Sequence, residues 1–148
     1  MVSPIDCFIS YSSADLCLAE ILYEKLSQAG YSVWFDRVRL EPGYDWQAEI
    51  EQACECSSII IPLLTPNWRQ SIWTKYETYG HDAVIPILAH GSFDECAPSP
   101  IRRWQALCIE GKLEDQPNWA KLCKSVDKLL ERDDIRPSRI WIPKGLRV

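Results

Sequence analysis

Short apolar runs alternate along the chain with longer stretches in which apolar residues recur at helical spacing. The runs 5–12, 31–36, 58–64, 83–89 and 104–110 are rich in apolar, β-branched or aromatic residues, which favours strands. The run 58–64 is continuously apolar, as is typical of a strand covered on both faces. The run 104–110 has the weakest strand pattern. We therefore expect a strand at each run.

The stretches between these runs predict helices. Segment 14–30 carries apolar residues on one face and ends at Gly30, a residue type that commonly stops a helix. Further helices are expected over 45–57, from the "TPNW" stretch at 65–68 onward, and over 116–134. The last of these has one apolar face, made by Trp119, Leu122, Cys123, Val126 and Leu129.

The ends of these elements carry capping and turn signals. Ser12, Ser13 and Asp15 are each candidates for the N-cap of the first helix, because their side chains accept hydrogen bonds from helix amides. Segment 90–103 is rich in turn-forming residues, and we expect no helix there.

Strands that alternate with helices imply βαβ crossovers and a parallel sheet. We predict an α/β fold with a single doubly wound five-stranded parallel sheet, flavodoxin-like in class, with helices on both faces. The domain is expected to span 1–135. The tail 136–148 is either a docked segment or a linker to a further domain.

Composition narrows the function classes. A chain of 148 residues fits one domain with a normal core. Its formal net charge is −5 and it has no basic run, which argues against a direct nucleic-acid or anionic-membrane partner. No apolar stretch reaches the roughly 18 residues that span a bilayer, and the N-terminus has no secretory-signal pattern. We expect a cytoplasmic protein.

The cysteines favour reduced thiols. The chain has 7 cysteines, an odd number, and they are scattered through helix-like and strand-like segments. A disulfide framework would instead use an even number of cysteines. The "CEC" stretch at 54–56 lacks both the spacing and the second pair that zinc sites use, and only His81 and His90 could add imidazole ligands. We expect packed thiols and no metal.

Ligands of open parallel sheets bind outside the carboxyl ends of the strands. Small polar and charged residues follow those ends, at 10–12, 36–37 and 64–65. The chain has no glycine-rich dinucleotide fingerprint, no phosphate-binding loop and no nucleophile–histidine–acid arrangement. No bound cofactor is therefore expected.

Four stretches in order carry a resemblance to a known family. They are "CFISYSSAD", "GYSVWFD", "LEPGYDWQAEIEQACECSSIIIPLLTPNW" and "SIWTKYE". Together they resemble the Toll/interleukin-1 receptor (TIR) domain, in particular its bacterial, NAD-cleaving branch, closely over 5–90 and loosely beyond. The resemblance implies a five-stranded parallel sheet. It also makes 37–45 the family's mobile loop beside the active site.

The resemblance also implies an activity. Many bacterial TIR domains cleave NAD between nicotinamide and ribose, with NAD as substrate and no other cofactor. Their carboxylate lies four residues after a tryptophan, and those positions here are Glu77 and Trp73. Tyr76 also fits the enzymatic pattern and is taken as a substrate-binding residue.

The chemistry of this pair agrees with the resemblance. On a helix, positions four apart share a face. A carboxylate such as Glu77 stabilises the oxocarbenium-like ribose that forms when nicotinamide leaves, and the indole of Trp73 suits a cationic pyridinium ring. The alternative is structural, with Trp73 packed in the core and Glu77 facing solvent.

By resemblance, the first strand supplies Phe8, Ser10 and Tyr11 to the substrate pocket. Each has a structural alternative. Phe8 suits the core, and the serine hydroxyls suit nearby backbone groups.

Three further positions border the loop. Asp36 either holds the ribose or the loop, or only ends the strand. Arg37 departs from the family, which often has an acid there, and either attracts the NAD pyrophosphate or alters loop docking between subunits. Trp46 is either a pocket wall or a helix anchor.

The resemblance further implies self-association with other TIR domains, a fused or separate sensor domain, and a role as a bacterial immune effector against phage. Hydrolysis to ADP-ribose and cyclisation to a cyclic isomer both remain open. Two rivals are a non-catalytic adaptor that acts through TIR–TIR contacts and a nucleotide transferase on the same fold.

Overall fold

The computed structural model describes residues 5–35, 53, 55–70, 83–89, 91–96, 106–109 and 116–132. The strands are β1 (Ile5–Ser10), β2 (Val33–Trp34), β3 (Ser57–Leu64), β4 (Ile87–Leu88) and β5 (Leu107–Cys108). The helices are the 3₁₀ turn η1 (Ser13–Asp15), α1 (Leu16–Gln28), α3 (Pro66–Gln70), α5 (Phe93–Cys96) and α6 (Gln116–Leu130).

The strands form one five-stranded sheet in the order β2-β1-β3-β4-β5. Every neighbouring pair is parallel, with Ile9 opposite Ile61 at the centre and Leu63 opposite Ile87 beside it. The α/β class and the five-stranded parallel sheet are therefore confirmed. The chain leaves β1 toward β2 and then returns to the other side of β1 as β3. The point where the strand order reverses, and where ligands of such sheets bind, thus lies between β1 and β3.

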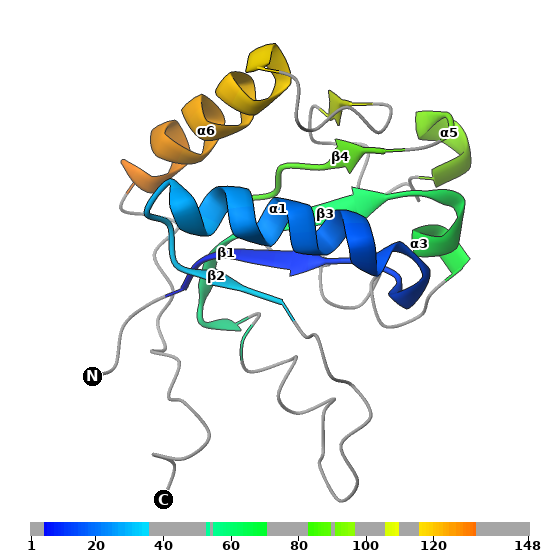
Figure 1. Cartoon of the computed structure of the whole chain (residues 1–148), viewed down its shortest axis with the longest axis horizontal. Coiled ribbons are helices and arrows are strands. Elements are labelled where there is room, and N and C mark those ends of the chain that lie inside the picture. Colours follow the sequence, from blue (N-terminus) through cyan, green and yellow to red (C-terminus); the bar gives the residue numbers. More distant parts are fainter. Residues whose placement is uncertain are drawn as a thin grey trace, which may run out of the picture.

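Strand β3 is buried along its whole length, as its continuous apolar run predicts. Ile61 faces the larger core cluster, which also contains Leu22 of α1 and Leu122 of α6. Figure 1 shows α1 and α6 over the same face of the sheet. Ile60 faces the opposite side and packs in a cluster with Phe8. The two faces of β3 are thus filled by different clusters.

Helix α1 ends where its glycine predicts. Gly30 has a φ of +97°, a left-handed conformation that side chains with a Cβ rarely adopt. The amide of Gly30 donates to the Ser27 carbonyl at 3.1 Å, and the amide of Ala29 donates to the Lys25 carbonyl at 3.2 Å. These bonds satisfy carbonyls that the last turn of a helix otherwise leaves unpaired.

The predicted N-cap candidates behave differently from expectation. Asp15 occupies the N-cap of α1, yet its side chain makes no capping hydrogen bond. Ser12 precedes η1 and likewise makes no side-chain cap. The carboxylate of Asp15 instead binds a residue far along the chain, as described below.

Helix α6 confirms the predicted apolar face and ends earlier than predicted. Leu122 and Val126 are fully buried, and Trp119 and Leu129 pack against the same core cluster. The helix ends at Leu130 instead of 134, and the Arg132 amide donates to the Leu129 carbonyl at 3.0 Å in the turn that follows.

One short helix, α5, lies in the segment where no helix was expected. The Ser92 hydroxyl accepts the Glu95 amide at 3.2 Å, and the Cys96 amide donates to the Ser92 carbonyl at 3.1 Å. Ser92 and Glu95 form an S-x-x-E pattern, which is a recognised helix-start signal. The expectation was wrong because this capping pattern starts a helix inside a segment that is otherwise rich in turn-forming residues.

The outer strands are shorter than their apolar runs. In segment 83–89, Val84 pairs with Ile60 as an isolated bridge and β4 itself begins at Ile87. Pro86 lies between them and has no N–H to donate to a neighbouring strand, so the ladder is interrupted there.

In the part of the chain that the structure describes, no helix is long and apolar enough to cross a membrane.

Candidate functional site

Four polar side chains meet at the carboxyl ends of β1 and β3. They are Ser10 at the end of β1, Asp15 just before α1, Thr65 directly after β3, and Trp68 in α3. In Figure 1 both strands point toward the side of the molecule where α3 lies. This group therefore occupies the described part of the edge where the fold class binds its ligands. We call it the switch-point network.

Thr65 is the centre of the switch-point network. Its hydroxyl donates to a carboxylate oxygen of Asp15 at 2.7 Å and accepts the backbone amide of Trp68 at 3.1 Å. The second bond is an N-cap bond for α3, whose first residue, Pro66, suits a helix start. The Thr65 side chain and its bond to the Trp68 amide are buried, whereas its bond to Asp15 is partly buried. One hydroxyl thus starts α3 and joins it to the loop after β1.

Trp68 provides a second link between α3 and β1. Its indole N–H donates to the Ser10 hydroxyl at 3.2 Å, and both residues are 0% exposed. The ring packs in a cluster with Leu64, Leu88 and Cys96. A buried indole requires an acceptor for its N–H, and Ser10 supplies it.

Trp68 was not among the predicted site residues. The local signal was present, since Thr65 and Pro66 mark a helix start and Trp68 stands at the position whose amide such a cap binds. Its partner Ser10 lies 58 positions away in the sequence. Only the parallel pairing of β1 with β3 brings the two together.

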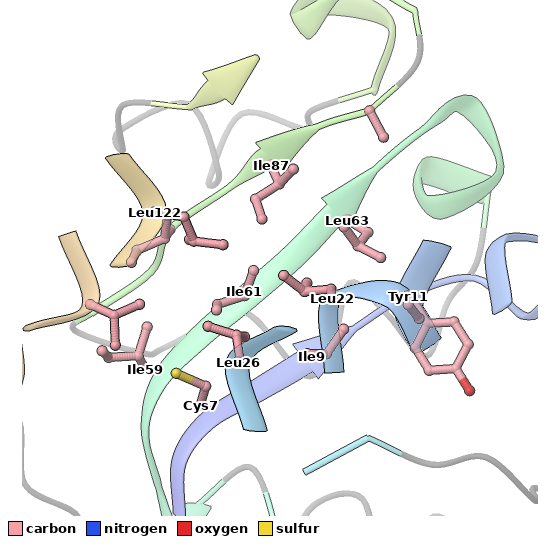
Figure 2. Packing of buried hydrophobic residues seen from close by; sticks show 14 of the residues in the cluster. Cys7, Ile9, Tyr11, Leu22, Leu26, Ile59, Ile61, Leu63, Ile87 and Leu122 are labelled. Carbon is pink, nitrogen blue, oxygen red and sulfur yellow. The ribbon is translucent and has the colours of Figure 1, made fainter. Parts of the chain in front are cut away.

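Phe8 and Tyr11 point to opposite faces of the sheet. Phe8 is 1% exposed and stacks on Trp34, with ring centroids 4.9 Å apart and an interplanar angle of 10°. Tyr11 belongs to the larger core cluster, and its ring lies 5.9 Å from that of Phe35. Figure 2 shows Tyr11 beyond the end of β1. The structure therefore does not bring Phe8 and Tyr11 together, and their contact with substrate stays a prediction.

The remaining predicted site residues lie outside the part of the chain that the structure describes. They are Asp36, Arg37, Trp46, Trp73, Tyr76 and Glu77. Glu77 follows the last described residue of α3, Gln70, by a short stretch of sequence. Their roles as catalytic or substrate-binding residues also stay predictions.

The clear pKa shifts in the described part of the chain belong to groups outside the switch-point network. Burial and a hydrogen bond to Asp127 raise the pKa of the Tyr31 hydroxyl, which also lies 3.3 Å from the Cys123 carbonyl oxygen. Burial likewise raises the pKa of the Cys7 thiol and of the Cys123 thiol. The Tyr31 hydroxyl thus links the segment before β2 to α6.

The described residues hold no group of three or more His, Cys, Asp or Glu side chains that could bind a metal ion. Cys54 of the "CEC" stretch lies outside those residues. None of the six described cysteines forms a disulfide; they are Cys7, Cys17, Cys56, Cys96, Cys108 and Cys123.

Alkylation should separate these thiols by exposure. We expect iodoacetamide to modify the exposed Cys17 and Cys108 in the folded protein and to leave Cys7, Cys56 and Cys96 unmodified. The thiolate is the reactive form, and burial both hides Cys7 and raises its pKa. Peptide mapping by mass spectrometry at pH 8 measures this, with protein in urea as the control that labels every thiol. Equal labelling of Cys7 and Cys17 in the folded protein would contradict the packing described here.

Most of the chain matches the model of one protein family. The model of the TIR domain matches residues 7–136. The chain belongs to the TIR domain family. The match includes every element of the sheet from the middle of β1 to β5, together with α6. The TIR fold predicted from the four sequence stretches is thereby confirmed.

Two curated relatives of this TIR domain are bacterial enzymes. A 2′ cyclic ADP-D-ribose synthase of Bacteroides thetaiotaomicron is 29% identical over 91 residues, which cover 55% of this chain and 32% of the relative. A 2′ cyclic ADP-D-ribose synthase of Acinetobacter baumannii is 30% identical over 91 residues, which cover 55% of this chain and 34% of the relative. The matched region is thus about a third of each relative's length.

A solved structure supports the fold independently. The TIR domain of the Toll-related receptor TRR-2 from Hydra magnipapillata superposes with a TM-score of 0.69 at 21% identity, over 83% of this chain and 98% of that domain. At this identity the likeness shows the fold alone. The relatives named above therefore carry the functional argument.

Proposed function

We propose that this TIR domain cleaves NAD, releases nicotinamide and forms ADP-ribose or a cyclic ADP-ribose. The observation that carries the proposal is the similarity to two TIR proteins that are named as 2′ cyclic ADP-D-ribose synthases. A cyclic ADP-ribose contains the ADP-ribose part of NAD without its nicotinamide. The Glu77 and Trp73 spacing, which resembles that of the NAD-cleaving branch, supports the same reaction.

The reaction begins with cleavage of the bond between the ribose anomeric carbon and the nicotinamide nitrogen. The bonding electron pair leaves with nicotinamide, which becomes neutral, and the ribose acquires oxocarbenium character. In the proposal, the Glu77 carboxylate stabilises that positive charge, as carboxylates do in glycoside cleavage. In hydrolysis, water then adds to the anomeric carbon and loses a proton, which gives ADP-ribose. In cyclisation, a hydroxyl of the same ADP-ribose adds to that carbon and loses its proton, which closes the ring of a cyclic ADP-ribose.

The arrangement of the described residues agrees with a site at this edge of the sheet. The switch-point network lies between β1 and β3, where ligands of this fold class bind. It holds the start of α3, the element whose sequence runs on toward Trp73 and Glu77. Trp73 is proposed to stack on the nicotinamide ring before it leaves. Asp36 and Arg37 are proposed to contact ribose and pyrophosphate.

We further propose that the domain acts when it is assembled with other TIR domains, as a bacterial immune effector controlled by a sensor domain. The chain spans only about a third of its curated relatives, so a controlling part in the whole protein is consistent with the comparison.

Product analysis tests the proposal. The full chain is incubated with NAD at high protein concentration with a crowding agent, and its self-association is measured by light scattering in the same buffer. Chromatography is expected to show nicotinamide together with ADP-ribose or a cyclic isomer, and the second product separates hydrolysis from cyclisation. Base exchange with added free pyridines in excess of NAD loss would favour a transferase. Absence of turnover in demonstrably assembled protein would overturn the enzyme proposal in favour of an adaptor.

A further inference from the structure

We propose that Thr65 is a positioning residue of this TIR domain. Its hydroxyl joins the start of α3 to the loop after β1. In this proposal, that attachment positions the stretch of sequence after α3, which carries Trp73 and Glu77. The inference rests on the proposed function, because it takes Glu77 as the catalytic carboxylate. Thr65 itself is not proposed to touch NAD.

The hydrogen-bonding capacity of Thr65 supports this role. A hydroxyl has one donor hydrogen, and here that hydrogen is directed to the Asp15 carboxylate at 2.7 Å. A lone pair of the same oxygen accepts the Trp68 amide at 3.1 Å. Hydrogen bonds to a charged carboxylate are stronger than neutral ones. Because Thr65 is only 1% exposed and its bond to the Trp68 amide is buried, water has little access to replace that bond. The bond to Asp15 is partly buried.

The behaviour of Asp15 is an independent sign that the link serves more than local folding. An aspartate at an N-cap ordinarily accepts an amide hydrogen of its own helix. Asp15 occupies the N-cap of α1 and makes no such bond, while its carboxylate binds Thr65 across 50 positions of sequence. The N-cap side chain of α1 thus makes a long-range hydrogen bond in place of the usual capping bond. Exceptions of this kind to local sequence preferences are expected at functional sites.

Trp68 attaches the start of α3 to the sheet at a second point. Its indole is held by Ser10 at 3.2 Å, and its ring is packed against Leu64 and Cys96. The N-cap bond at Thr65 and the indole bond at Ser10 together attach α3 to both the loop after β1 and the end of β1. Since misplacing a catalytic group by about 1 Å can cost a hundredfold in rate, the attachment at Thr65 should affect turnover.

Two variants isolate the Thr65 hydroxyl. Thr65→Val keeps the shape of the side chain and removes both hydrogen bonds, whereas Thr65→Ser keeps the hydroxyl. We expect Thr65→Val to lower kcat for NAD cleavage by the assembled full chain about tenfold to a hundredfold with little change in KM. Thr65→Ser should keep the wild-type kcat. The control is Val126→Ala, a buried change in α6, which contributes no residue to the switch-point network; it is expected to lower thermal stability.

Amide hydrogen exchange of peptides from 66–80 is measured on the same variants. Thr65→Val should raise exchange there and leave α6 protected, whereas Thr65→Ser and Val126→Ala should leave 66–80 as in the wild type. A general loss of protection in Thr65→Val, or unchanged kcat and exchange, would overturn the inference.

The two proposals fail in different ways. If wild type cleaves NAD and Glu77→Ala does not, while Thr65→Val behaves as wild type, only the positioning role is wrong. If the assembled wild type does not cleave NAD, the proposed function is wrong. The exchange of 66–80 in Thr65→Val then decides whether Thr65 orders this segment.

Discussion

Replacing Glu77 with glutamine is expected to lower NAD cleavage by about 10²–10³-fold without changing the fold. Glutamine keeps the size of the side chain and removes the negative charge that opposes the developing positive charge on ribose. Glu77→Ala should lose activity to at least the same degree. Nicotinamide release, followed by chromatography under assembling conditions, measures both variants against wild type.

The matched control is Glu24→Gln, which removes an exposed carboxylate from α1. Glu24 has no part in the switch-point network, and its variant should cleave NAD as wild type does. Circular dichroism and thermal melting verify that each variant is folded. If Glu77→Gln retained wild-type turnover, the assignment of Glu77 as the catalytic carboxylate would be wrong, even if NAD cleavage itself were observed.

Replacing Ile61 with alanine is expected to destabilise the fold by about 2–5 kcal/mol. Ile61 is 0% exposed on the central strand β3 and lies among Ile59, Leu22 and Leu26 (Figure 2). The neighbouring strands and α1 surround the side chain, so the cavity left by truncation cannot easily close. Urea unfolding followed by tryptophan fluorescence measures the change in the free energy of unfolding.

A smaller change at the same position provides the comparison. Ile61→Val should cost about 0.5–1.5 kcal/mol, because it removes one methylene group. Lys124→Ala on the exposed side of α6 should change stability by no more than about 0.5 kcal/mol in either direction. Equal losses for Ile61→Ala and Lys124→Ala would mean that β3 is not the packed centre of the domain.

The long periodic elements were predictable because their burial follows from a local pattern. A strand that is apolar throughout, such as β3, must be covered by other elements on both faces of the sheet. A helix with one apolar face, such as α6, must bury only that face. Gly30 likewise ends α1 through its own backbone conformation. The outer strands were less predictable, since the length of β4 depends on which amides find partners across the sheet and on Pro86.

The candidate site was predictable only in part. Motif order identified the family, and it nominated Glu77 and Trp73 from a spacing of four. It did not reveal Trp68 as a link to Ser10, nor Asp15 as the partner of Thr65. The α5 helix was not predicted, although Ser92 and Glu95 form a local capping pattern within the turn-rich segment.

The sequence by itself determined the alternation of strands and helices, the parallel α/β class and the membership of the TIR family, because each rests on patterns within a few tens of residues. Only the tertiary structure decided which polar side chains meet at the carboxyl ends of the strands. Asp15 and Thr65 are 50 positions apart, and Ser10 and Trp68 are 58 apart. Their hydrogen bonds exist because β3 returns to lie beside β1, and that strand order is a property of the folded sheet.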